Sequence, residues 1–303
     1  MICPTCGKQE VKAVGISNWL HSKSKHYQCK QCGRQWTLNE KNPKILYFDI
    51  ESTRAKAEVE FWPGEQHKGL YIRPDNITED WFVLGWAAKW VCTSGMMSYV
   101  VKPSEAKKRD DKRILKPLWD LFNEADILVG HNAKKFDVKK MNWRWMVNGY
   151  NPPKPYKIVD TLTEIGKIAA PTSKALDFIA KQAGLNGKMK HRLGLFQECR
   201  DGIPDALREL RKYNEIDVIE GEAVYLWMRP WMSSHPNMGL YYETDKPVCR
   251  NCGSPNLDFD ELSKVYTSAN VYHCWTCKNC GAHGRTPESV MKENLLKRER
   301  LMR

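Results

Sequence analysis

The chain has 303 residues, 42% of them hydrophobic, and a formal net charge of +12. This length and apolar content predict one sizeable core with one or two small modules, and they exclude a disordered chain. No run approaches the roughly 18 to 20 apolar residues of a membrane span and no signal peptide follows Met1, so we expect no membrane partner and a reducing, cytoplasmic compartment.

Cysteine pairs mark both ends of the chain. Four CxxC pairs, each followed by glycine, are formed by Cys3 and Cys6, Cys29 and Cys32, Cys249 and Cys252, and Cys277 and Cys280. Each pair predicts a tight turn that aims two sulfurs at one point, and two such turns complete a tetrahedral site for Zn²⁺. The spacing therefore predicts two zinc ribbons built on short β-hairpins, each with one structural zinc ion.

Other arrangements use the same residues. Disulfides are disfavoured in a chain with no secretory signal. A mixed site of the first pair with His21 and His26 has permissible spacing, but it leaves the second pair without a role. Cys274 lies three residues before Cys277 and could replace a ribbon ligand. The glycine after Cys280 and the aromatic residue before Cys277 favour the pair of Cys277 with Cys280.

The two ends are also the most basic parts of the chain. Residues 1–41 contain seven Lys or Arg and two acids, and residues 249–303 contain nine and six. The long middle carries a net charge of only +4. We expect nucleic acid to be the partner of such ends, although solvated charged faces would have the same composition.

Between the cysteine pairs, the apolar pattern predicts alternating strands and helices. We expect strands at residues 44–51, 81–91, 96–101, 126–129 and 156–159, and helices at residues 111–124, 136–147, 176–183 and 204–228. Residues 52–80 are long for a connection and predict a functional loop or a disordered one. This order of elements predicts an α/β fold with a mixed sheet.

Two acids end the first of these strands. Asp49 and Glu51 are two positions apart, so their side chains share one face of the strand. Carboxylates held so close repel each other unless a cation lies between them. Taken alone, a solvated polar strand end explains the pair equally well.

Two further segments supply polar groups. The chain leaves a strand at Gly130 and begins a helix near Asp137, at the edge where α/β folds place their sites. Tyr213 and Asp217 are four residues apart on the last core helix and share a face. Taken singly, Asp137 suits the first turn of a helix, and the pair of Tyr213 with Asp217 suits a helix surface.

Together these segments form a pattern. The D-x-E strand, the H-N-x3-F-D segment at residues 131–137 and the Y-x3-D segment at residues 213–217 resemble the three exonuclease motifs of the DEDD or DnaQ-like superfamily, in its DEDDy branch. The resemblance covers about residues 44–230 and implies a ribonuclease H-like core. Residues 187–189 and 229–237 also resemble ribonuclease H-like proteins common in phage genomes, which implies the host cytoplasm.

The resemblance implies a metal-dependent 3′–5′ exonuclease that hydrolyses phosphodiester bonds with two Mg²⁺ or Mn²⁺. Carried over to this sequence, Asp49 would bridge the two metals, and Glu51 and Asp217 would bind the first. Asp137 would support the second metal, and Tyr213 would orient the attacking water.

Neighbouring residues correspond to family positions that touch the terminal nucleotide, namely Ser52, Thr53, His131 and Asn132. Turn or helix capping is their alternative role. Asp160 is expected as a supporting acid or as the N-cap of a following helix. The basic residues near Asp137 would guide phosphates or form a solvated helix face, and they are Lys134, Lys135, Lys139, Lys140 and Arg144.

We therefore expect four parts: a zinc ribbon at residues 1–41, an exonuclease core at 42–232, a linker at 233–247, and a zinc ribbon with a basic tail at 248–303. Single-stranded 3′ ends are the expected substrate, with DNA favoured over RNA, and a replication or repair protein is a candidate partner. The alternatives are a ribonuclease or structure-specific nuclease, and a non-catalytic nucleic-acid-binding adaptor. The five clustered polar residues argue against an adaptor.

Overall fold

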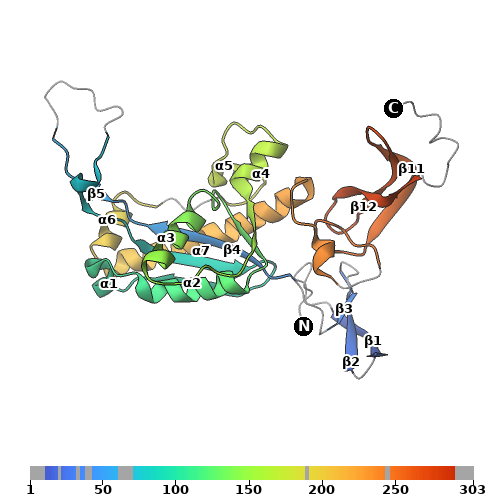
Figure 1. Cartoon of the computed structure of the whole chain (residues 1–303), viewed down its shortest axis with the longest axis horizontal. Coiled ribbons are helices and arrows are strands. Elements are labelled where there is room, and N and C mark those ends of the chain that lie inside the picture. Colours follow the sequence, from blue (N-terminus) through green and yellow to red (C-terminus); the bar gives the residue numbers. More distant parts are fainter. Residues whose placement is uncertain are drawn as a thin grey trace.

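The computed structural model describes residues 11–19, 22–31, 35–37, 43–60, 71–187, 191–242 and 246–290. Its centre is a five-stranded mixed sheet in the order β10-β9-β4-β7-β8 (Figure 1). The central strand β4 (Ile45–Ser52) pairs antiparallel with β7 (Val83–Trp90) and parallel with β9 (Ile127–Gly130). The edges are β8 (Met96–Val100) and β10 (Lys157–Asp160), so the predicted α/β fold with a mixed sheet is confirmed.

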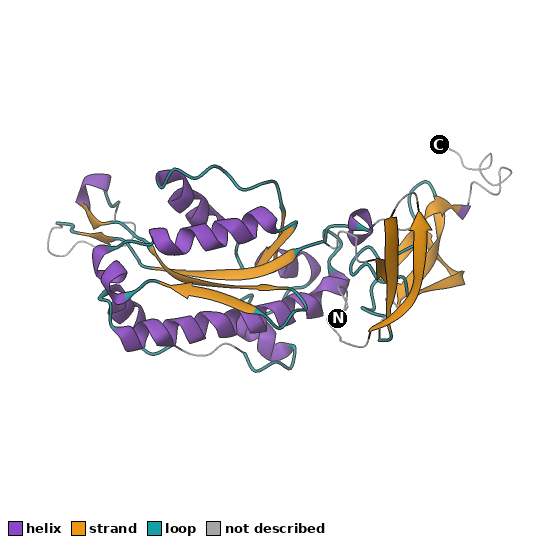
Figure 2. Ribbon diagram, turned by 90° about the horizontal axis from the view of Figure 1, so that it is seen from below, coloured by secondary structure: helices purple, strands orange, loops and turns teal. Residues whose placement is uncertain are grey.

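Helices cover both faces of this sheet (Figure 2). They are α1 (Pro103–Lys108), α2 (Lys112–Glu124), α3 (Asp137–Val147), α4 (Thr161–Ile168), α5 (Leu176–Gln182), α6 (Leu195–Arg200) and α7 (Pro204–Met228). Because both faces are covered, β4 is apolar on both sides. Leu46 and Phe48 pack with α2 and α3, whereas Tyr47 packs on the opposite face with α5 and α7.

The structure adds elements that the sequence pattern did not predict. The helices α1 and α6 have six residues each, too few to show a period. The long connection after β4 contains a small hairpin, in which β5 (Lys56–Ala57) pairs with β6 (Ile77–Glu79). Residues 61–70 of this connection lie outside the described part of the chain.

The close approach of α7 to β4 depends on Gly221. A Cβ atom at this position would lie 2.0 Å from the hydroxyl oxygen of Tyr47, so only glycine leaves room for the phenol. Gly221 lies one helical turn after Asp217, and Tyr47 lies two residues before Asp49 on the same strand face. This contact therefore sets the distance between the two elements that carry acids.

Each end of the described chain forms a three-stranded antiparallel sheet. The N-terminal sheet contains β1 (Val11–Trp19), β2 (Ser22–Cys29) and β3 (Gln35–Thr37). The C-terminal sheet contains β11 (Leu257–Tyr266), β12 (Val271–Cys277) and β13 (His283–Ser289). Among the described residues, no helix is long and apolar enough to cross a bilayer.

The C-terminal sheet lies beyond the end of α7 (Figures 1 and 2) and is held there by hydrogen bonds. The side-chain amide of Asn251 donates to the Arg229 carbonyl at 2.9 Å, and the Arg250 guanidinium donates to the Ser233 carbonyl at 2.7 Å. Asn251 is buried. These bonds join the turn between Cys249 and Cys252 to the segment that follows α7.

His235 is buried in this joint. Its Nε2 lies 2.7 Å from the Tyr225 hydroxyl and its Nδ1 lies 2.8 Å from the Pro236 carbonyl, which indicates a neutral ring protonated on Nδ1. Burial and the Arg229 charge lower the pKa of His235 to about 4, with a smaller contribution from Arg250. The Pro236 carbonyl and Glu164 oppose this shift.

Acidification should therefore weaken the fold through His235. Its folded pKa lies below its unfolded value of about 6.5, so protonation favours the unfolded chain and stability falls as the pH drops below that value. Between pH 7 and pH 5 this residue should cost about 2 kcal/mol of the free energy of unfolding. Urea unfolding at both pH values should show that acidification is about 2 kcal/mol less favourable for the wild type than for His235→Gln, a difference in which other titrating groups such as Asp137 cancel. Equal losses in the two proteins would contradict it.

Candidate active site

Three carboxylates converge where α7 crosses β4. Asp49, Glu51 and Asp217 each bring a carboxylate oxygen within 4.8 Å of the others. Asp217 is buried and the two strand acids are half-buried. Oxygens bound to one Mg²⁺ lie within about 4.2 Å of each other, which is twice the metal–oxygen distance. The oxygens of this site can therefore reach one divalent cation after small side-chain movements.

Asp137 lies beside this set, against the backbone of β4. Strand β9 pairs with β4 only as far as Tyr47, and beyond that point the Ile50 amide donates to Asp137 Oδ1 at 3.2 Å. The carboxyl group thus reaches the strand between Asp49 and Glu51, although it is outside the group within 4.8 Å. Burial raises the pKa of Asp137 to about 7.

Negative charge is concentrated at this position. Burial, followed by the charges of Asp49, Asp137 and Asp217, raises the pKa of Tyr47 well above its ordinary value. Asp137 itself is 3% exposed and receives a further upward contribution from Asp160. A bound cation would offset this repulsion.

Asp160 positions the loop that leads to Asp137. Its carboxylate accepts hydrogen bonds from the backbone amides of Asn132 and Lys134, each at 3.0 Å. The same carboxylate caps the first turn of α4. His131 Nδ1 lies 2.9 Å from the Thr161 hydroxyl, so this end of the loop is tied to α4 as well. The expected N-cap role of Asp160 is observed, and its role as a supporting acid of the site stays a prediction.

Tyr213 lies one turn before Asp217 on α7 and is 8% exposed. Its ring meets His191 edge to face, with 5.6 Å between the centroids. His191 belongs to no recognised sequence motif, and only the fold brings it to Tyr213.

Asn214 is a second residue that the sequence analysis missed. Its buried side-chain amide donates to Asp49 Oδ2 at 2.6 Å. The signal was present, because Asn214 and Asp217 are three residues apart and share the helix face. Asn214 orients the carboxylate of Asp49 toward the site.

A pocket of about 380 Å³ adjoins the end of β4. It is lined by residues 52–54, residues 191–197 and Arg200. Ser52 and Thr53 thus lie beside a basic segment, as a nucleotide site would require. Both hydroxyls already have partners, since Ser52 accepts from Lys140 at 2.7 Å and Thr53 accepts from a backbone amide of the sheet at 3.0 Å. The pocket does not include His131 or Asn132.

Arg144 was expected to guide phosphates, but in the structure it pairs with a buried carboxylate. Its guanidinium forms two hydrogen bonds, of 2.7 and 2.8 Å, with the fully buried carboxylate of Asp111. Asp111 also accepts from the Val83 amide at 2.9 Å. Arg144 therefore stabilises the core. Lys140 lies beside the end of β4, where it donates to Ser52, and burial lowers its pKa.

The C-terminal cysteine pairs form a second candidate metal site. The four sulfurs of Cys249, Cys252, Cys277 and Cys280 lie within 4.8 Å of one another. The distances from Cys249 to Cys280 and from Cys252 to Cys277 are both 3.7 Å. Tetrahedral zinc with Zn–S bonds of about 2.3 Å requires about 3.8 Å between sulfurs, and a disulfide requires about 2 Å. Cys274 is outside this set.

The glycines behave as the CxxCG spacing predicts. Gly253 and Gly281 have φ of +73° and +74°, and their amides donate to the Cys249 and Cys277 carbonyls. Of the N-terminal cysteines, Cys29 is buried at the end of β2, and Cys3, Cys6 and Cys32 lie outside the described residues. The N-terminal zinc site stays a prediction.

Comparisons with known proteins give one family match, and it lies within the core. Residues 90–229 match the family model of the RNase_H superfamily. Among solved structures, the family B DNA polymerase from the hyperthermophilic archaeon Pyrobaculum calidifontis aligns with a TM-score of 0.42 and 16% identity, over 62% of this chain and 25% of the polymerase chain. No curated protein matches the chain. The matched region includes Asp137, Tyr213 and Asp217.

Asn214→Ala should weaken cation binding, because Asp49 loses the donor that orients it. Loss of such a supporting contact typically costs 10-fold to 100-fold in metal affinity. Calorimetric titration with Mn²⁺ would measure the change. Ile219→Ala, at an exposed position of the same helix, is the control and should bind like the wild type. Wild-type affinity in Asn214→Ala would contradict the assigned contact.

Cys277→Ser should release one zinc ion per chain, since a tetrahedral site loses a quarter of its ligands. Cys274→Ser is the matched control, three residues away on the same strand, and should release none. The zinc content of the purified proteins, measured by mass spectrometry, decides between them. Zinc loss in Cys274→Ser with retention in Cys277→Ser would show that the ligand set is wrong.

Proposed function

We propose that this chain, whose core is a ribonuclease H-like domain, is a metal-dependent 3′–5′ exonuclease of the DEDDy type. It would hydrolyse phosphodiester bonds of nucleic acid, with DNA favoured over RNA. The observation that carries the proposal is the convergence of Asp49, Glu51 and Asp217, which come from a strand and a helix far apart in the sequence.

The proposed cofactors are two Mg²⁺ or Mn²⁺. Asp49, Glu51 and Asp217 are close enough to share such an ion, and Asp137 is buried against the same strand, where a cation would favour its ionised form. Asp49, Glu51 and Asp217 would hold one cation, and Asp49 with Asp137 would hold the other. When bound, such cations lower the pKa of a water and stabilise the charge that develops on the departing 3′ oxygen.

The chain's own residues would supply orientation. Asn214 fixes Asp49 through the 2.6 Å hydrogen bond. Tyr213 shares the helix face of Asp217, and we assign its hydroxyl to positioning the attacking water. The pocket of Ser52 and Thr53 would hold the terminal nucleotide, with Lys140 and the basic segment near Arg192 attracting its phosphate. His131 and Asn132, in the loop between β9 and α3, would contact the nucleic-acid strand.

Several finer features belong to the same proposal. The C-terminal cysteines, and by analogy Cys3, Cys6, Cys29 and Cys32, would hold two structural zinc ions. A phage origin, a host cytoplasmic location and a replication or repair partner stay predictions from the sequence resemblance. A non-catalytic adaptor would not need carboxylates whose repulsion destabilises the fold.

The experiment is the digestion of a 5′-labelled single-stranded DNA by the full-length protein with Mn²⁺ or Mg²⁺. The wild type should give a ladder of labelled products that shortens from the 3′ end. Asp49→Asn should slow the reaction by at least about 100-fold, because an electrostatic contact to the reacting group is lost. Tyr213→Phe should slow it by about 10-fold to 100-fold. Parallel reactions with RNA and duplex DNA define the substrate.

The control is Asp120→Asn, which makes the same chemical change at a carboxylate on α2 that pairs with Lys116 at the surface. It should digest like the wild type. Undiminished digestion by Asp49→Asn would show that the site is wrong. Release of the label as a mononucleotide would show the opposite direction of digestion.

A further inference from the structure

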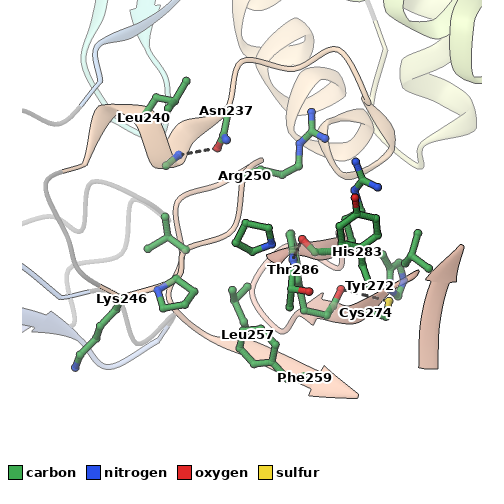
Figure 3. A pocket seen from close by; sticks show the side chains of 18 residues that line it. Asn237, Leu240, Lys246, Arg250, Leu257, Phe259, Tyr272, Cys274, His283 and Thr286 are labelled. Atoms are coloured by element: carbon green, nitrogen blue, oxygen red, sulfur yellow. Dashed lines mark hydrogen bonds between the residues drawn. The ribbon is translucent and has the colours of Figure 1, made fainter. Parts of the chain in front are cut away.

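A pocket of about 1120 Å³ lies between the C-terminal sheet and the segment that follows α7 (Figure 3). One wall contains the short helix η3 (Met238–Tyr241) and residues 246–250, and the other contains strands β11, β12 and β13. The pocket is far from the carboxylates, because the part of α7 from Asp217 to Met228 alone spans about 16 Å. It needs an explanation separate from the active site.

The lining of this pocket is basic and aromatic. Its basic side chains are Lys246, Arg250, His283 and Arg285. Its aromatic side chains are Phe259, Tyr272 and Trp275. None of the described lining residues is acidic. This combination suits a polyanion with flat apolar groups, which is the chemistry of unpaired nucleotides.

The individual contacts favour that ligand. Phe259 is 47% exposed, so its ring is available for stacking. The Arg285 guanidinium lies 4.0 Å from the centroid of Tyr272, which presents a charge and a ring at one place. In Figure 3, Arg250 lies on the opposite wall, where its guanidinium donates to the Ser233 carbonyl at 2.7 Å. The pocket therefore offers an exposed ring at Phe259 and a guanidinium on each wall.

The pocket is also rigid. A Cβ on Gly284 would lie 2.0 Å from the Trp275 ring, so this glycine lets the indole pack on β13. The Trp275 indole donates to the Arg285 carbonyl at 3.0 Å. The cysteine set at the end of β12 and the Asn251 hydrogen bonds fix the two walls relative to each other. A preorganised surface of this kind loses little entropy on binding.

We propose that this pocket binds unpaired nucleotides of a single-stranded nucleic acid, with bases against Phe259 and Tyr272 and phosphates at Arg250 and Arg285. It would hold the strand at a second point, remote from the carboxylates. That purpose rests on the proposed exonuclease function, whereas the binding itself does not.

Binding is measured by fluorescence anisotropy of a labelled 20-nucleotide oligo(dT), with the zinc-loaded full-length protein and no Mg²⁺ or Mn²⁺. Phe259→Ala/Arg285→Ala should raise the Kd at least about 10-fold, because one stacking platform and one phosphate contact are lost. The slope of log K against log salt should also fall by about 0.7.

The matched control is Leu262→Ala/Lys264→Ala, which removes one apolar and one basic side chain at exposed positions of β11 outside the pocket. Its Kd should change less than about twofold. If the first double variant loses zinc, Arg285→Gln alone carries the test with the same expected fall in salt slope. Equal affinity of pocket and control variants would overturn the proposal.

Two further measurements separate this proposal from the exonuclease function. Digestion of a dinucleotide should be unchanged in Phe259→Ala/Arg285→Ala, because so short a strand cannot span the helix length of about 16 Å that separates the two places. Failure of Asp49→Asn to reduce digestion would remove the exonuclease proposal and leave the binding result standing. Unchanged DNA affinity together with lost affinity for a poly-glutamate peptide would reassign the pocket to an acidic protein and overturn nucleotide binding.

Discussion

Repulsion among carboxylates is the constraint on which the core depends. Asp49, Glu51 and Asp217 are brought within reach of one cation, and Asp137 is buried against the same strand. The packing that imposes this arrangement is specific, since Gly221 allows Tyr47 to lie under α7. Without a cation the arrangement costs free energy, as the raised pKa of Asp137 indicates. A divalent cation held between these carboxylates would offset the repulsion.

The two kinds of candidate metal site differ in ligand chemistry and in position. Carboxylate oxygens at the centre of the core suit Mg²⁺ or Mn²⁺, and four sulfurs in the C-terminal sheet suit Zn²⁺. The sulfur site holds a turn whose Asn251 bonds to the end of α7. One helix thus carries Asp217 and, at its far end, anchors the basic and aromatic pocket. Because α7 joins the two places, the distance between the two proposed contacts with a nucleic-acid strand is fixed.

The sequence was informative where a single segment carries the signal. A run of apolar residues predicted β4, and the geometry of a strand predicted the shared face of Asp49 and Glu51. The sequence pattern also predicted α7 with both of its ends. Short elements such as α6 were not predicted, because six residues cannot show a helical period. Contacts between distant segments could not be predicted from the sequence either. The donation from Asn214 to Asp49 and the pairing of Arg144 with Asp111 depend on packing that no local pattern encodes.

The central claim is that the core carboxylates form a cation site, and crystals soaked in Mn²⁺ test it most directly. Anomalous diffraction at the manganese edge should show density beside Asp49, Glu51 and Asp217, with a second peak toward Asp137. Data at the zinc edge from the same crystals should show a peak among Cys249, Cys252, Cys277 and Cys280, which verifies that ions are visible. Zinc density at the cysteines with no manganese density at the carboxylates would contradict the account.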